Sequence, residues 1–112
     1  MSETFQDTAR YNFKTIRRGA TFTSRSLTIQ EASGTTLVSA ELIFTAGGAT
    51  ASALTKSSGS GLTLTSTEAG NWIVTIEQFD VALAEDVYSY ELWTVDSANR
   101  RWCYLAGNMK VI

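Results

Sequence analysis

Acidic side chains that could do acid–base chemistry gather in one short stretch, where Asp80 precedes the neighbouring pair Glu85 and Asp86. Hydrolysis of a glycosidic bond needs two carboxyl groups that face each other across a cleft. Two adjacent residues in a turn do not provide that arrangement, and we expect this stretch to be a solvated loop. It also lacks the alternating Asp-x-Asp-x-Asp-Gly pattern of a calcium-binding loop, so we assign no metal site to it.

Serine nucleophiles are plentiful in this chain, but they lack partners that would activate them. The sequence contains no histidine, which removes the commonest general base and the commonest transition-metal ligand. Only Lys14, Lys56 or Lys110 could act as a base, and no spacing places one of them beside a serine. The run 57–61 is rich in Ser and Gly but lacks the Gly-Lys-Ser/Thr ending of a phosphate-binding loop. We expect a protein that is not an enzyme and assign no catalytic residue and no cofactor.

The composition is that of one globular domain. The 112 residues carry a formal net charge of −2, which gives no strong electrostatic case for nucleic acid or an anionic membrane as a partner. No run approaches the roughly 18 apolar residues of a membrane span, and the first residues lack the regions of a signal peptide. Cys103 is the only cysteine, so no intrachain disulfide can form, which suits folding in a reducing cytoplasm.

Alternating apolar residues, typical of half-buried strands, run from Gly19 to the end of the sequence. The expected strands lie at 21–30 with a bulge or break, 37–45, 62–65, 72–76, 87–95 and 101–112, and the segment 51–56 is a weak strand or a loop. About seven strands with turns every 8–12 residues favour an all-β fold, a β-sandwich. The last two strands flank a turn at 96–99, and we expect this hairpin to close a complete small domain.

Tyr88 begins a long strand five residues after Leu83. This spacing resembles the tyrosine corner of Greek-key sandwiches, in which the hydroxyl bonds to upstream backbone. The alternative is an ordinary core tyrosine at the start of a strand.

The first eighteen residues differ from the rest, and we expect an N-terminal arm at 1–18 followed by a single sandwich domain at 19–112. Its basic residues are Arg10, Lys14, Arg17 and Arg18, against the acidic Glu3 and Asp7. The arm either docks on an acidic neighbour or is a frayed, solvated terminus. Its apolar side chains favour docking, and the docking candidates are Phe5, Tyr11, Phe13, Arg17 and Arg18.

Aromatic residues of the final hairpin are the main candidate for a binding surface. If Leu105 and Val111 face the core, then Trp93, Trp102 and Tyr104 lie together on the outer face of one sheet. An exposed aromatic patch of that size usually marks an interface. Its partner would be a neighbouring subunit or a ligand, or the chain's own arm would fold over it.

Five short motifs follow one another along the chain. They are Ala32-Ser33-Gly34, Ser39-Ala40-Glu41-Leu42, Gly61-Leu62-Thr63-Leu64, Leu83-x4-Tyr88-Ser89-Tyr90-Glu91-Leu92 and Leu105-Ala106-Gly107-Asn108-Met109-Lys110-Val111. Their order resembles the small immunoglobulin-like β-sandwich modules of tailed-bacteriophage structural proteins, found in baseplates, tail fibres and head fibres, such as the upper baseplate protein amino-terminal domain. The chain departs from those modules before Tyr88, where Glu85-Asp86-Val87 replaces a glycine, and it lacks their Asp-Leu-Thr-Gly before the second strand.

The resemblance implies an immunoglobulin-like Greek-key sandwich that serves as a virion structural protein and is made in the host cytoplasm. It implies assembly with other virion proteins and with itself, in the tail, baseplate or fibre-attachment region. Capsid decoration is the alternative position. A carbohydrate-binding module, in which the aromatic patch stacks on sugar rings, is the alternative class of function.

Overall fold

The computed structural model describes residues 9–30, 36–68 and 71–112, and every regular element within them is a β-strand. Seven strands have five residues or more: β3 (Arg25–Gln30), β4 (Leu37–Ala46), β5 (Leu54–Ser58), β6 (Gly61–Glu68), β7 (Asn71–Ile76), β9 (Asp86–Asp96) and β10 (Arg101–Val111). Three have two residues each: β1 (Ala9–Arg10), β2 (Thr21–Phe22) and β8 (Phe79–Asp80). The prediction of an all-β chain with about seven main strands is confirmed.

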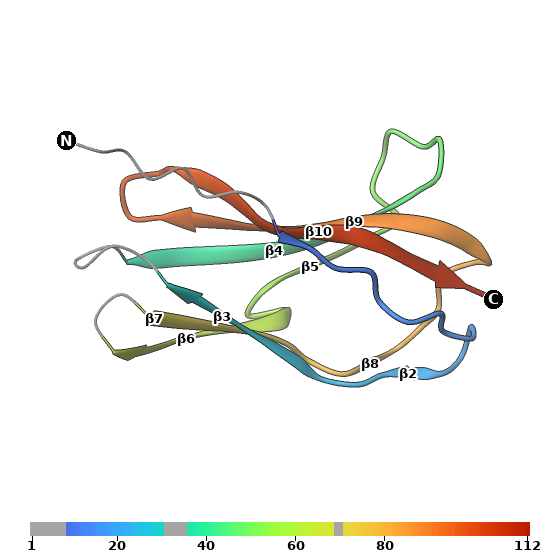
Figure 1. The fold of residues 1–112 in the computed structure, drawn as a ribbon, viewed down its shortest axis with the longest axis horizontal. Coiled ribbons are helices and arrows are strands. Elements are labelled where there is room, and N and C mark those ends of the chain that lie inside the picture. The colour runs from blue at the N-terminus through green and yellow to red at the C-terminus, as the bar shows by residue number, and fades with distance from the viewer. Residues whose placement is uncertain (1–8, 31–35, 69–70) are drawn as a thin grey trace.

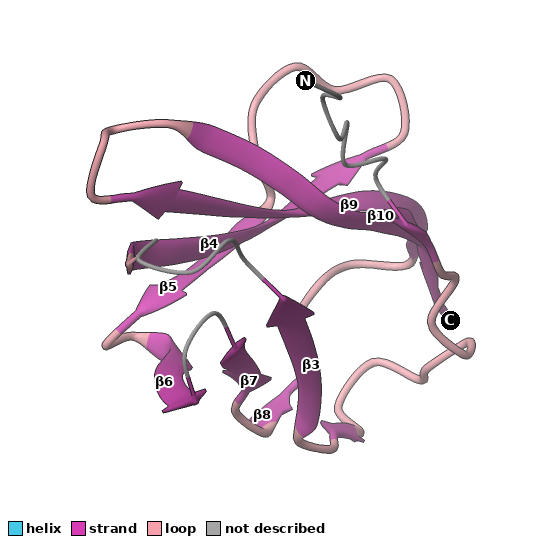
Figure 2. Ribbon diagram, turned by 60° about the vertical axis from the view of Figure 1, so that its left-hand side comes forward, coloured by secondary structure: helices cyan, strands magenta, loops and turns pink. Residues whose placement is uncertain are grey.

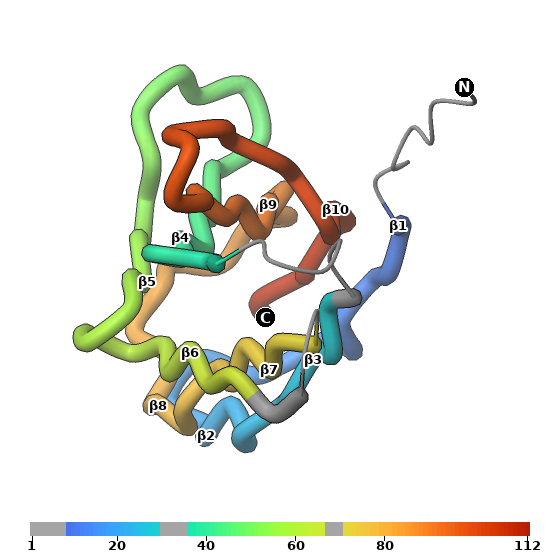
Figure 3. The backbone as a smooth tube through the Cα atoms, turned by 90° about the vertical axis from the view of Figure 1, so that its left-hand side faces the viewer, coloured from blue at the N-terminus to red at the C-terminus, as the bar shows by residue number. Residues whose placement is uncertain are grey.

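Two layers of strands face each other across the core (Figure 1). One layer runs β1-β10-β9-β4-β5 and the other runs β6-β7-β3, while β2 pairs separately with β8. At one side the chain bends from β5 directly into β6, so pairing continues from one layer to the next (Figure 2). Seen along the strands in Figure 3, β5 and β1 lie at opposite sides of the upper layer. This strand order is that of an immunoglobulin-like Greek-key sandwich.

The core forms where buried and more exposed side chains alternate along the strands. On β4 the side chains of Ala40, Leu42 and Phe44 are buried, and on β9 those of Tyr90 and Leu92 are buried opposite them. Successive residues of a strand point to opposite faces, so this spacing of two predicts the inward face directly. Each large apolar side chain removed from water stabilises the fold by about 1.5–3 kcal/mol.

Tyr88 forms the tyrosine corner. Its hydroxyl donates a hydrogen bond of 2.6 Å to the carbonyl oxygen of Ala84, four residues upstream, while its ring is buried at the start of β9. The bond holds the loop between β8 and β9 against the sandwich, and two side chains of that loop, Val81 and Leu83, are buried. The tyrosine-corner interpretation is therefore confirmed.

The break predicted within 21–30 is also confirmed, because β2 and β3 are separate strands that pair with different partners. The hairpin turn at 96–99 is likewise confirmed between β9 and β10, with Asn99 in the left-handed region at φ 63°. Residues other than glycine rarely adopt that backbone conformation, but asparagine adopts it more often than most. The turn expected at 32–35 lies outside the described residues.

Residues 9–18, which we expected as part of an N-terminal arm, pack along the sandwich in the structure. Ala9 and Arg10 pair in parallel with β10, and the amides of Phe13 and Arg18 donate to the carbonyls of Asn108 (3.0 Å) and Ile112 (2.8 Å). Phe13 is only 7% exposed and stacks on Tyr90 with 4.4 Å between ring centroids. In this segment only Ala9 and Arg10 form a regular strand. The remaining residues run beside β10 without the alternation of a strand, so the apolar residues are irregularly spaced.

Candidate interaction surfaces

Trp93 lies near the middle of the outer face of the layer formed by β4, β9 and β10. Residues directly opposite each other on antiparallel strands share a face, and the partners of Trp93 are Glu41 on β4 and Cys103 on β10. Val95, one step along the same face of β9, has Arg101 opposite it. The guanidinium of Arg101 lies over the indole ring, 4.8 Å from its centroid.

The outer face around Trp93 therefore combines an apolar centre with charged neighbours. The partly buried apolar side chains on it are Trp93, Val95 and Ile43, and the charged ones are Glu41, Glu91 and Arg101. Cores of protein interfaces are enriched in Trp and Arg and have polar rims. We call these six residues the Trp93 surface.

Trp102 and Tyr104 do not join Trp93, so the predicted three-residue aromatic patch does not form. The register of β10 against β9 shifts between Cys103 and Leu105, which makes Tyr104 an extra residue in a β-bulge. A bulge reverses which residues face inward. Trp102 consequently pairs opposite the buried Thr94, on the face away from Trp93.

The environments of these two aromatic residues differ from each other as well. Trp102 is 36% exposed near the hairpin end of the sheet, whereas Tyr104 is partly buried against the core. The hydroxyl of Tyr104 is buried and has no hydrogen-bond partner among the described residues. The role of Trp102 and Tyr104 as interface residues remains a prediction. Trp93 and Trp102 lie on opposite faces of the sheet.

A second surface, which sequence reasoning missed, is a groove between the edges of the two layers. It has a volume of about 510 Å³ and opens between the segment at 9–13 and β3. Its floor is apolar and reaches the core; the side chains of the floor are Leu27, Val74, Ile76, Leu92 and Leu105. The volume lies within the range of about 300–1,000 Å³ that is typical of ligand pockets. No sequence motif marks this groove, because it arises where the edges of two distant strands fail to meet.

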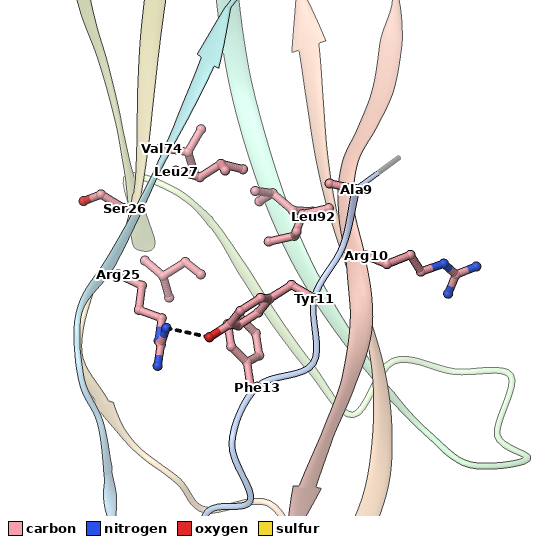
Figure 4. Close-up of a pocket in the computed structure, with 11 residues that line it drawn as sticks. Ala9, Arg10, Tyr11, Phe13, Arg25, Ser26, Leu27, Val74 and Leu92 are labelled. Atoms are coloured by element: carbon pink, nitrogen blue, oxygen red, sulfur yellow. Dashed lines mark hydrogen bonds between the residues drawn. The ribbon is translucent and has the colours of Figure 1, made fainter. Parts of the chain in front are cut away.

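Arg25 and Tyr11 bridge the groove at one end (Figure 4). The Arg25 guanidinium donates a hydrogen bond of 3.2 Å to the Tyr11 hydroxyl and lies 5.7 Å from the centroid of the Phe13 ring. Arg25 turns toward Tyr11, and Arg10 points outward from the opposite rim (Figure 4). A guanidinium over aromatic rings is held by the ring quadrupoles, so the bridge positions a cation at the mouth of the groove.

Tyr90, which is buried in the core, contacts the segment at 9–13. Its hydroxyl donates a hydrogen bond to the backbone carbonyl of Tyr11. Burial raises the pKa of Tyr90 to about 12, with a smaller contribution from Tyr11 and an opposing one from Arg25. The hydroxyl therefore stays a donor throughout the physiological range.

Basic residues concentrate in the segment 10–25, whose first and last residues line the groove. Residues 10–25 contain Arg10, Lys14, Arg17, Arg18 and Arg25 and no Asp or Glu. All five are exposed, and Arg17 and Arg18 lie in the turn that leads to β2. The only ion pair among the described residues joins Arg100 to Asp96, so these five cations lack carboxylate partners there. Tyr11 is exposed beside them whereas Phe13 is buried, and Phe5 lies outside the described residues.

The carboxylates of the acidic stretch lie at the surface of the molecule. Asp80, Glu85 and Asp86 are all exposed, and Asp80 accepts a hydrogen bond of 2.8 Å from the hydroxyl of Thr21. Within the described residues, no group of three or more His, Cys, Asp or Glu side chains could hold a metal ion. No helix in that part of the chain has the length and apolar character needed to span a membrane.

Comparison with known proteins yields a weak likeness to solved structures. No protein-family model matches the chain, and no curated protein was found to be similar to it. Among solved structures, murine CRIg is similar with a TM-score of 0.37 and 12% identity, and the match covers 92% of each chain.

Proposed function

We propose that this protein is a non-enzymatic assembly module, a virion structural protein of a tailed phage or prophage in the tail, baseplate or fibre-attachment region. The ordered motifs between Ala32 and Val111, which resemble phage modules, support the virion setting. The Trp93 surface supports the assembly role.

The observation that carries the assembly role is the position of Trp93. A large aromatic side chain lies near the middle of an outward sheet face, with aliphatic neighbours and a cation stacked on it. Centrally placed Trp and Arg side chains dominate the binding energy of many interfaces. A neighbouring virion subunit that covers this face would bury Trp93 and Val95 while the charged rim selects the partner.

Arg101 also bears on the alternative of carbohydrate binding. Sugar rings stack on an open aromatic face, and one face of the Trp93 indole is already covered by the guanidinium. The arrangement of Arg101 on Trp93 therefore favours binding of a protein over binding of a carbohydrate at this surface.

Quantitative mass spectrometry of purified particles tests the virion setting by counting this chain against the major shell subunit. We expect a small fraction of the shell copy number, as for a tail, baseplate or fibre-base component. A ratio near one would instead indicate a capsid decoration protein. Absence from particles would contradict the proposal and favour a binding module outside the virion.

Replacing Trp93 tests the contact itself. We expect Trp93→Ser to reduce incorporation into particles about tenfold or more, since truncating a central hot spot costs about 2 kcal/mol or more. Trp102→Ser is the matched control, because Trp102 is on the same hairpin but on the opposite face. Incorporation of Trp93→Ser at the wild-type level would show that the Trp93 surface is not the docking site, provided that circular dichroism shows both variants to be folded.

A further inference from the structure

The groove between 9–13 and β3 has the features of a site for an extended peptide strand. Among the described residues, β3 is the terminal strand of its layer and pairs with β7 alone. An edge strand presents backbone N–H and C=O groups to any strand laid beside it, and recognition by strand addition uses those groups for affinity and side-chain pockets for specificity. Here the pocket, about 510 Å³ with Leu27 and Leu105 on its floor, lies immediately beside the free edge.

The charge around the groove restricts the occupant. Arg25 at the mouth and Arg10 on the opposite rim have no carboxylate partner among the described residues. Lys14 lines a smaller cavity of about 160 Å³ that also includes Arg25. An apolar floor with a basic rim fits an extended segment in which an apolar side chain is flanked by carboxylates.

Residues 1–8 of this chain have that chemistry. In an extended strand Glu3, Phe5 and Asp7 point to the same side, with each carboxylate about 7 Å from Phe5 along the strand. A buried Phe side chain contributes roughly 150–250 Å² of contact area. Phe5 would enter the apolar cavity, and Glu3 and Asp7 would then lie toward the basic rim.

The register of β1 favours a second copy as the source of this segment. β1 runs parallel to β10 with Ala9 opposite Leu105, so the chain reaches the groove from the β9–β10 hairpin side. To place Phe5 in the groove of its own molecule, the chain would have to reverse direction within the three residues between Phe5 and Ala9. Eight extended residues span about 26–29 Å, enough to reach an adjacent molecule.

We propose that residues 1–8 of one copy bind in the groove of a second copy and add a strand to the free edge of its β3, with Phe5 in the apolar cavity. The exchange is reciprocal, since a symmetric pair satisfies both grooves at once. This self-association goes beyond the proposed function, because it uses a side of the molecule distinct from the Trp93 surface.

Sedimentation velocity of the full chain over a range of concentrations tests the proposal. We expect a dimer whose dissociation constant rises at least tenfold in Phe5→Ser. The dimer should also weaken as salt is added, because exposed charges are screened over about 10 Å at 0.1 M ionic strength. A chain that stays monomeric at every concentration and salt would overturn the proposal.

Charge exchange between two variants identifies the contact. One variant carries Glu3→Arg with Asp7→Arg, and the other carries Arg10→Glu with Arg25→Glu. Each alone should be monomeric, while an equimolar mixture should form a heterodimer with near wild-type affinity. Failure of the mixture to associate, with both variants folded by circular dichroism, would overturn the exchange.

Trp93→Ser separates this inference from the proposed function. We expect Trp93→Ser to dimerise as the wild type does, whatever its incorporation into particles. A dimer that survives all charge variants but is lost in Trp93→Ser would show that copies associate through the Trp93 surface, which would refute groove binding and leave the assembly role intact.

Discussion

Two tyrosines of the hairpin region show how the same hydroxyl contributes differently in two environments. The Tyr88 hydroxyl donates to the Ala84 carbonyl, whereas that of Tyr104 is buried with no partner among the described residues. We expect Tyr88→Phe to lower the free energy of unfolding by about 1 kcal/mol, the net value of a typical hydrogen bond.

Tyr104→Phe is the matched control for that prediction. It removes an unpaired buried hydroxyl, so we expect the free energy of unfolding to stay unchanged or to rise by up to about 1 kcal/mol. Urea denaturation of both variants measures the difference. A loss of stability in Tyr104→Phe as large as in Tyr88→Phe would contradict this account of the two side chains.

Asp96 makes the stability of the hairpin depend on pH. Hydrogen bonds from the Arg100 and Ala98 amides and the Arg100 guanidinium hold its pKa below the ordinary value of 3.8, against an opposing effect of burial. A lowered carboxylate pKa adds stability above the unfolded-state value, and that stability is lost as pH falls through the folded-state value. We therefore expect the stability advantage of the wild type over Asp96→Asn to shrink below about pH 4.

Urea denaturation from pH 2 to pH 7 measures that advantage directly. Glu91→Gln, which changes an exposed carboxylate on the same strand, is the control. An advantage that stays constant over the whole range would show that the carboxylate charge of Asp96 does not stabilise the turn.

Among the elements, the segment at 9–18 depends on a close approach to β10 at Gly107. A Cβ at this position would overlap the backbone carbonyl of Tyr11 and approach the Asn12 side chain. We expect Gly107→Ala to cost about 1–3 kcal/mol, as overpacking does. It should also increase hydrogen exchange at the Phe13 and Ile16 amides, which bond to β10 carbonyls in the native protein.

Gly47→Ala is the matched control for the Gly107 variant. A Cβ there would be at an ordinary distance of 3.5 Å from the Val87 carbonyl oxygen, so stability should change by no more than about 0.5 kcal/mol. Unchanged amide exchange in Gly107→Ala would contradict the close approach.

The elements also show what sequence patterns can predict. The strands at 37–45 and 87–95 were predictable because their inward residues recur every second position, and the tyrosine corner was predictable from the interval between Leu83 and Tyr88. The position of Trp93 and Trp102 on opposite faces was not predictable, because a bulge adds one residue without a local signal. The position of residues 9–18 depends on pairing with residues nearly a hundred positions away, which no local pattern reports.

At the scale of the whole molecule, two contact surfaces occupy different sides of one sandwich. The Trp93 surface lies on a sheet face, while the groove lies where the layers open between β1 and β3. If both proposals hold, self-association and attachment to the particle are separable, and each can be removed by variants that leave the other intact. A dimer formed in this way would then bind a neighbouring subunit through two identical faces.

The parallel pairing of residues 9–18 with β10 also determines how the protein would carry tension. Pulling on Ala9 and on Ile112 in opposite directions would slide the two segments past each other along their length. The hydrogen bonds between them, from Tyr11 to Arg18, would then bear the load together rather than open one after another. Such shear geometry resists extension, so a domain held at these two points would transmit mechanical force without unravelling from its ends.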